Sequence, residues 1–232
     1  MKICTAVMTY DDPLYNHFDK IKRAYLEKNN EDYYFVYNGT DNSKNDLSKR
    51  SLNYYSDIHN EGGIPVIYLK FINLIQSGIF NNYDFIIRVN SSTFINMDII
   101  REKLATLKDN IYMGFFDPAW HFVSGACIIF SQDMLQLLAK NFNTVNYFKE
   151  DDVVIGDIMT SQNVNKTYLD RYCLHNLTAV PSEEEIQKAL TYPQIRIRNH
   201  LNNQGIYEGM GSKNRAIVDV GIWNKISNIL QL

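Results

Sequence analysis

The chain has 232 residues, of which 45% are hydrophobic and 21% charged, and its formal net charge is -3. This balance is typical of a globular protein of one domain and excludes a disordered, collagen-like or coiled-coil chain. The slightly acidic charge argues against a protein whose main task is to bind nucleic acid. No apolar stretch approaches the length of a transmembrane helix, so we expect no membrane span.

Short apolar runs alternate with amphipathic segments along the chain. A buried strand at Ile3–Met8 ends in a polar turn, and an aromatic strand at Tyr33–Tyr37 ends at Asn38-Gly39. The polar residues 40–51 predict a loop. Further strands are expected at Tyr83–Val89, Ile111–Phe116 and Val123–Phe130, and helices at Asn16–Asn29, Ile64–Ile79, Met97–Leu107, Ser131–Asn141 and Glu150–Met159. After Leu174 the pattern weakens to a strand or two, a short helix near Glu183–Leu190 and a tail.

This alternation predicts an α/β fold with a mostly parallel sheet. Ligands of such sheets bind beyond the carboxyl ends of the strands. We therefore expect residues 9–12, 38–40 and 90–93 to line one edge of the sheet. The cysteines Cys4, Cys127 and Cys173 are odd in number and far apart, which indicates thiols in a reducing compartment.

Three segments carry candidate chemistry, each with an ordinary structural alternative. The acids of Glu150–Asp157 favour protonation of one another, which suits a general base, or they form an acidic first helical turn. Small polar residues at Asn90–Thr93 suit a nucleotide or a metal, or they connect a strand to a helix. Gly125 lets a ligand approach the backbone, or it packs at the start of a strand. The common phosphate-binding, serine-hydrolase and zinc-protease motifs are not found in the sequence.

The order and spacing of these segments resemble the beta-1,3-galactosyltransferase and Fringe-like glycosyltransferases. The resemblance covers roughly residues 20–160. The segments that carry it are Tyr83–Arg88, Phe94-Ile95-Asn96, Ser124-Gly125 with Ser131-Gln132-Asp133, and Asp151–Gly156. Weaker similarities lie at Phe35–Gly39 and between Asp57 and Lys70.

The resemblance implies a single domain of the A-type glycosyltransferase fold, which is Rossmann-like, with a mostly parallel central sheet and flanking helices. It implies a UDP-sugar donor, a glycan acceptor and inversion at the anomeric carbon. Asp152 would take the proton of the attacking acceptor hydroxyl, and Asp151 would assist it. Residues 1–120 would bind the nucleotide sugar, and residues 121–232 would bind the acceptor and supply the base.

The expected binding residues follow from the same comparison. Uridine would lie against Thr9, Tyr10 and Asn38, and the donor's phosphates would lie near Arg88, Asn90, Ser91, Ser92, Lys213 and Arg215. The acceptor would contact Trp120, His121 and Gly125, although core packing is an alternative for Trp120. The Gly-rich segment Gly205–Arg215 is either a lid over the diphosphate or a surface loop.

One departure concerns the metal. The family holds Mn²⁺ or Mg²⁺ with an Asp-x-Asp stretch, whereas this chain has Asn90-Ser91-Ser92, without a carboxylate. We therefore expect metal-independent transfer, in which cations neutralise the diphosphate. The alternatives are a weak metal site at His175 and an inactive protein that binds nucleotide sugars or glycans. A nucleotidyltransferase is disfavoured, because residues 9–13 lack a Gly-rich basic loop.

A second departure concerns the N-terminus. Eukaryotic members of the family carry a membrane anchor, whereas this chain begins directly at a predicted strand. We expect a cytoplasmic enzyme from a bacterium or a large virus, or the trimmed catalytic domain of a longer protein.

Overall fold

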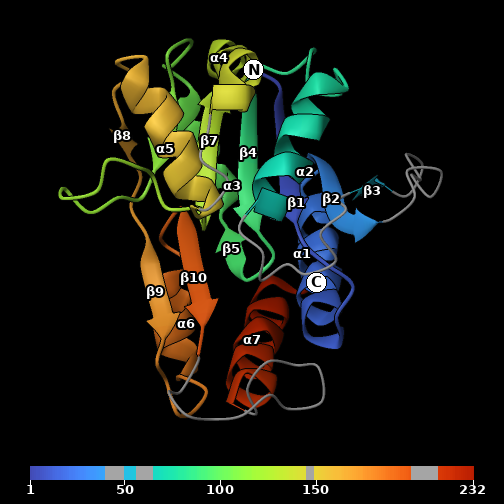
Figure 1. The fold of residues 1–232 in the computed structure, drawn as a ribbon. Coiled ribbons are helices and arrows are strands. Elements are labelled where there is room, and N and C mark those ends of the chain that lie inside the picture. Colours follow the sequence, from blue (N-terminus) through green and yellow to red (C-terminus); the bar gives the residue numbers. More distant parts are fainter. Residues whose placement is uncertain (40–49, 56–64, 145–148, 200–213) are drawn as a thin grey trace. The chain divides into compact units, whose positions relative to one another are not determined.

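The computed structural model describes residues 1–39, 50–55, 65–144, 149–199 and 214–232. The chain divides into two compact units that alternate along the sequence (Figure 1). The large-sheet unit comprises Met1–Thr9, Asp32–Asn90 and Leu104–Leu169. The small-sheet unit comprises Tyr10–Glu31, Ser91–Lys103 and Asp170–Leu232. The expected division at residue 120 concerns binding roles and stays a prediction.

The large-sheet unit is built on a seven-stranded sheet of order β3-β2-β1-β4-β7-β6-β8. The strands are β1 (Ile3–Met8), β2 (Asp32–Gly39), β3 (Ser51–Tyr55), β4 (Phe85–Asn90), β6 (Tyr112–Gly114), β7 (Cys127–Ser131) and β8 (Thr167–Tyr168). Neighbouring strands from β3 to β4 are parallel, β7 runs antiparallel to β4 and β6, and β8 is parallel to β6. The predicted α/β class with a mostly parallel sheet is therefore confirmed.

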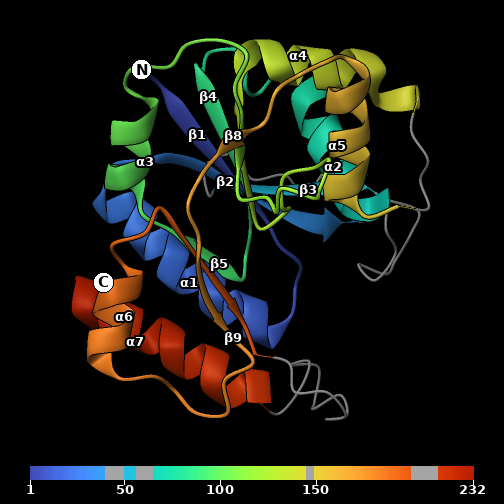
Figure 2. The ribbon, with the colours of Figure 1, turned by 90° about the vertical axis from the view of Figure 1, so that its left-hand side faces the viewer.

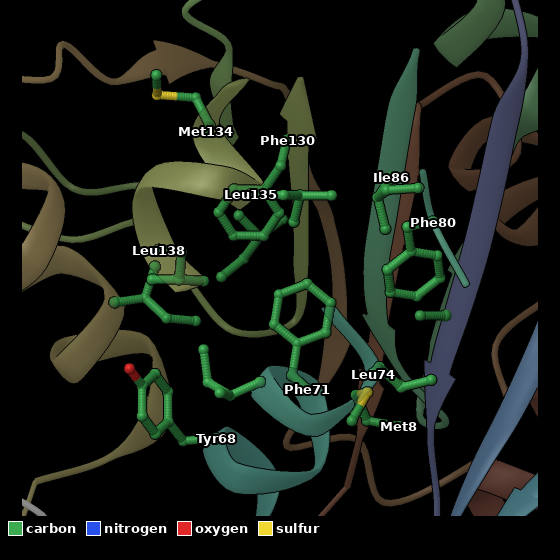
Figure 3. Packing of buried hydrophobic residues seen from close by; sticks show 14 of the residues in the cluster. Met8, Tyr68, Phe71, Leu74, Phe80, Ile86, Phe130, Met134, Leu135 and Leu138 are labelled. Atoms are coloured by element: carbon green, nitrogen blue, oxygen red, sulfur yellow. The ribbon is translucent and has the colours of Figure 1, made fainter. Parts of the chain in front are cut away.

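Three helices, α2 (Pro65–Gln76), α4 (Gln132–Asn141) and α5 (Asp151–Ser161), pack with this sheet in one hydrophobic core. Figure 3 shows Phe71 of α2 beside Phe130 of β7, and Tyr68 of α2 toward Leu138 of α4. A short 3₁₀ turn, Phe142–Thr144, follows α4. Every residue of β1 is buried, as expected for a strand in the middle of a sheet that is mostly parallel.

The periodicity of β4 places the charged side chain of Arg88 within this core. Side chains two residues apart point to the same face of a strand. Arg88 therefore lies on the same face of β4 as Ile86, the face that contributes to the core with α2, α4 and α5. Its side chain is fully buried, so it needs polar partners on that face.

The small-sheet unit contains three strands in the order β5-β10-β9, with β5 (Thr93–Ile95), β10 (Gln194–Arg198) and β9 (Tyr172–His175). Its helices are α1 (Pro13–Lys28), α3 (Met97–Leu104), α6 (Glu183–Ala189) and α7 (Val220–Leu230), and the π-helical turn Arg215–Asp219 leads into α7. Asp12 caps α1 by accepting from Leu14 N at 2.8 Å. Figure 2 shows α1, α6 and α7 together, and the fully buried Trp223 of α7 stacks on Phe18 of α1, with ring centroids 5.3 Å apart.

Several elements differ from the sequence expectation, and the short strands β5 and β8 were not expected. Residues 50–55 include the edge strand β3, although Ser51 was assigned to a loop, and residues 40–49 of that loop lie outside the described ranges. The expected tail contains α7, whose buried Ile222, Trp223 and Ile226 share one helical face. None of the helices in the described ranges is both long and apolar enough to cross a membrane.

Candidate functional site

Two adjacent carboxylates, Asp151 and Asp152, occupy the first turn of α5 in the large-sheet unit. The buried Arg88 guanidinium donates from Nη2 to Asp151 Oδ2 and from Nη1 to the carbonyl oxygen of Gly125. The Asp151 side chain is 15% exposed. Asp151 is thus committed to a largely buried ion pair with the strand that underlies it.

Asp152 is held by backbone amides. Its Oδ2 accepts from Gly125 N at 2.7 Å, and its Oδ1 accepts from Val153 N at 3.0 Å. A Cβ at position 125 would lie 3.2 Å from Asp152 Oδ2 and 3.1 Å from Arg88 Nη1. Glycine therefore allows the backbone to reach the carboxylate, and the structure brings Arg88, Gly125, Asp151 and Asp152 together.

Burial and neighbouring charges shape this cluster. Burial raises the pKa of the Asp151 carboxyl, Arg88 opposes the shift, and Asp152 adds to it. Burial likewise raises the pKa of Tyr112, so Tyr112 is a neutral phenol at pH 7. Its hydroxyl oxygen accepts from Val123 N at 3.0 Å, which fixes the segment that ends at Gly125.

The segment Trp120–Phe122 packs against the next turn of α5. A Cβ on Gly156 would lie only 2.3 Å from Phe122 Cβ, so this helical glycine makes room for the segment. The rings of Trp120 and Phe122 stack, with centroids 5.1 Å apart and planes 5° apart. Trp120 remains 37% exposed, and His121 Nε2 lies 3.0 Å from Asp157 Oδ1. The predicted acceptor residues Trp120 and His121 therefore adjoin the helix that carries Asp152.

The remaining candidates of the large-sheet unit lie at the carboxyl ends of its parallel strands. Thr9 directly follows β1, Asn38 lies near the end of β2, and Asn90 ends β4. Thr9 N donates to Val36 O at 3.1 Å, and Asn90 N donates to Ala126 O at 3.1 Å. This placement agrees with the expected edge, while their roles toward a donor stay predictions.

In the small-sheet unit, hydrogen bonds fix Ser91 and Ser92, which lie where the resemblance predicts an Asp-x-Asp stretch. Ser91 Oγ donates to Asp19 Oδ1 at 2.5 Å, and the Ser91 carbonyl accepts from the buried Lys22 Nζ at 3.0 Å. Arg196 Nη1 of β10 donates to Ser92 Oγ at 2.7 Å and to Thr93 Oγ1 at 3.1 Å. The Ser92 and Thr93 hydroxyls thus both accept from one nitrogen of a guanidinium group.

A second arginine of this unit lies at the entry to α7. Arg215 Nε donates to Asp219 Oδ2 at 2.8 Å, and its Nη1 donates to the Tyr15 hydroxyl at 3.2 Å. Asp219 also accepts from the side chain of Asn199 at 2.8 Å. Burial lowers the pKa of Arg215, but Tyr15 and Asp219 raise it, and the net shift is upward. The predicted uridine contact Tyr10 packs on the Tyr15 ring, with centroids 4.4 Å apart.

These residues do not fit a divalent cation. Positions 90–92 offer amide and hydroxyl groups, and the nearest fixed charge at Ser92 is a guanidinium, which repels a metal. Within the described ranges, no group of three or more His, Cys, Asp and Glu side chains is arranged to hold a metal. His175, the weaker candidate, is exposed at the end of β9.

Sequence reasoning missed Arg196 and Tyr112. The only local signal for Arg196 is the alternation Gln-Ile-Arg-Ile-Arg, which predicts a strand and gives no partner. Lys213 and the Gly-rich segment before Arg215 lie outside the described residues. A separate pocket of about 660 Å³ in the large-sheet unit lies at the amino ends of β1 and β4, beside Met1 and Asp84, and contains no predicted site residue.

Comparison with known proteins supports the fold. No protein-family model and no curated protein matches the sequence. Among solved structures, the chain is similar to the "crystal structure of a glycosyltransferase involved in the glycosylation of the major capsid of PBCV-1". The TM-score is 0.54 at 10% sequence identity, over 84% of this chain and 93% of that one. The chain thus has a glycosyltransferase-like fold, and the Fringe-like resemblance stays a prediction from its motifs.

Proposed function

We propose that this protein is an inverting glycosyltransferase that moves a hexose from a nucleotide-sugar donor, a UDP-sugar in our reading of the motifs, to a hydroxyl group of a glycan. The observation that carries the proposal is that two neighbouring carboxylates have different partners. Arg88 neutralises Asp151, whereas Asp152 accepts only from backbone amides among the described residues. Asp152 is therefore the one of the two carboxylates that is not committed to an ion pair.

In the proposed reaction, Asp152 accepts the proton of the acceptor hydroxyl. The acceptor oxygen forms a bond to C1 of the donor sugar while the bond between C1 and the phosphate oxygen breaks. The nucleoside diphosphate leaves with that electron pair, and the configuration at C1 inverts. The hydrogen bond from Gly125 N holds the carboxylate in one orientation, which lowers the entropic cost of the proton transfer.

The exposed aromatic segment beside α5 supports a glycan acceptor. The Trp120 indole stacks on Phe122, and the Trp120 side chain is among the exposed large hydrophobic side chains. Aromatic rings bind the apolar faces of sugar rings through the same kind of contact. We assign Trp120 to the acceptor and leave the identity of the sugar open to a donor screen.

The test is turnover of a panel of nucleotide sugars by wild-type protein and Asp152→Asn. We expect the substitution to lower kcat by two or more orders of magnitude, about the contribution of a general base, while donor affinity changes little. Asp98→Asn is the matched control, because Asp98 is also an acid in the first turn of a helix and is exposed. Equal turnover in wild type and Asp152→Asn would remove Asp152 from the mechanism. Donor binding without turnover in the wild type would favour an inactive binding protein.

A further inference from the structure

The most unusual charge in the small-sheet unit is Arg196. Among the residues that the structure describes, its hydrogen-bond partners are two neutral hydroxyl groups, Ser92 Oγ and Thr93 Oγ1. Within the part of the chain that the structure describes, no carboxylate lies within salt-bridge distance of its guanidinium. The side chain is half-buried, so solvent only partly compensates its charge.

Other arginines add to this excess of positive charge. The pKa of Arg196 is lowered to about 10, first by burial and then by Arg198, with Arg215 and Arg171 contributing and Tyr15 opposing the shift. Arg196 still carries a full charge at pH 7. The nearby acids are already engaged, since Asp219 binds Arg215 and Asn199, and Asp19 accepts from Ser91.

We propose that Arg196 is the central cation of a metal-independent site for the diphosphate group of a nucleotide. A half-buried guanidinium among like charges is costly unless an anion offsets it. Its planar fork matches two phosphate oxygens, and donors other than Nη1 remain for them. The choice of a diphosphate rests on the proposed function, because a nucleotide-sugar enzyme must bind that group.

The position of Arg196 supports this assignment. The register of β5 against β10 pairs Thr93 with Arg196, which fixes the guanidinium beside Ser92. The Ser92 and Thr93 hydroxyls accept directly from a cationic side chain, so a positive charge is supplied without a metal. Ser92 and Thr93 are buried and act as positioning residues.

The test is calorimetric titration of the 232-residue chain with UDP and with pyrophosphate, both in EDTA. Arg196→Gln should weaken binding of both by about 10- to 100-fold, the range for a charge-assisted hydrogen bond. Uridine, which lacks phosphate, should bind the two proteins equally. Arg101→Gln is the control, because it removes the same charge from the same unit, where Arg101 pairs with Glu31. Unchanged affinity in Arg196→Gln, or no binding of either anion by the wild type in EDTA, would overturn the inference.

Thermal unfolding separates a ligand-binding arginine from a structural one. Removing an uncompensated charge should raise the melting temperature of the free protein, whereas losing a structural arginine should lower it. If Arg196→Gln does not fold, Arg196→Lys keeps the charge without the fork and should bind pyrophosphate more weakly than wild type. Binding that depends on Arg196, without turnover of any donor, would keep this inference and reject the proposed function. Turnover with full UDP affinity in Arg196→Gln would reject this inference and keep the proposed function.

Discussion

The Arg88 guanidinium, buried within β4, forms an ion pair with Asp151 in the first turn of α5. This contact ties the central sheet to the helix that also carries Asp152. Arg88 Nε has no hydrogen-bond partner among the described residues, so the Asp151 carboxylate and the Gly125 carbonyl together compensate the charge. The contribution of the Arg88–Asp151 ion pair to stability can therefore be measured separately from activity.

Asp151→Asn should destabilise the protein by about 3 kcal/mol, because it leaves a buried guanidinium without its counter-charge. Urea unfolding measures this loss. Asp98→Asn, at an exposed position, should change stability by no more than about 0.5 kcal/mol. The double variant Arg88→Met with Asp151→Leu should recover most of the loss, since it removes both charges. A fully stable Asp151→Asn protein would show that the ion pair does not form.

Gly156→Ala should displace the aromatic segment from α5. The added Cβ would lie 2.3 Å from Phe122 Cβ and 2.8 Å from Phe122 Cα, and the backbone cannot yield as a flexible side chain does. We expect a loss of about 1 to 3 kcal/mol in stability, the usual cost of overpacking. Because Phe122 stacks on Trp120, tryptophan fluorescence should also shift. An unchanged spectrum and stability would mean that the segment lies elsewhere.

Gly125→Ala should affect activity more than stability. Its Cβ would sit at 3.1 to 3.2 Å from Arg88 Nη1 and from Asp152, contacts that a shift of a few tenths of an ångström relieves. That shift moves the proposed base, so we expect kcat to fall by about tenfold or more while the fold survives. Steady-state kinetics and thermal unfolding of the same preparation separate the two effects. A large loss of stability with normal kcat would argue against a positioning role for Gly125.

The sequence was sufficient for the inner strands of the large-sheet unit, which are continuous apolar runs, and for its helices, but not for its edge strands β3 and β8. It was insufficient for α7. Gly221 lowers helix propensity there, but its missing side chain makes room for Val180, whose Cγ2 would lie 2.3 Å from an added Cβ. Tertiary packing, which no local pattern reveals, therefore stabilises this helix.

The same limit applies to the candidate site. Asp151, Asp152 and Gly125 were identified through motifs, but the partner of Ser92 was not. Arg196 lies 104 residues away along the chain, and only the pairing of β5 with β10 brings the two together. Local sequence shows that a carboxylate is missing at residues 90–92, whereas the fold shows which group stands beside the serine instead.

Ser92→Asp tests whether the Arg196 guanidinium takes the place of a metal ion beside residue 92. From the motif alone, this change partly restores an Asp-x-Asp stretch and should create a metal site. From the structure, the new carboxylate would meet Arg196 Nη1, which now lies 2.7 Å from Ser92 Oγ, and would form an ion pair with it. We therefore expect no increase in melting temperature with Mn²⁺ and weaker binding of UDP in EDTA, because the carboxylate neutralises the guanidinium. Ser92→Ala, which removes the hydroxyl without adding a charge, should weaken UDP binding less. Stabilisation of Ser92→Asp by Mn²⁺ beyond that of the wild type would mean that the new carboxylate binds a metal in preference to the arginine, as the motif alone suggests.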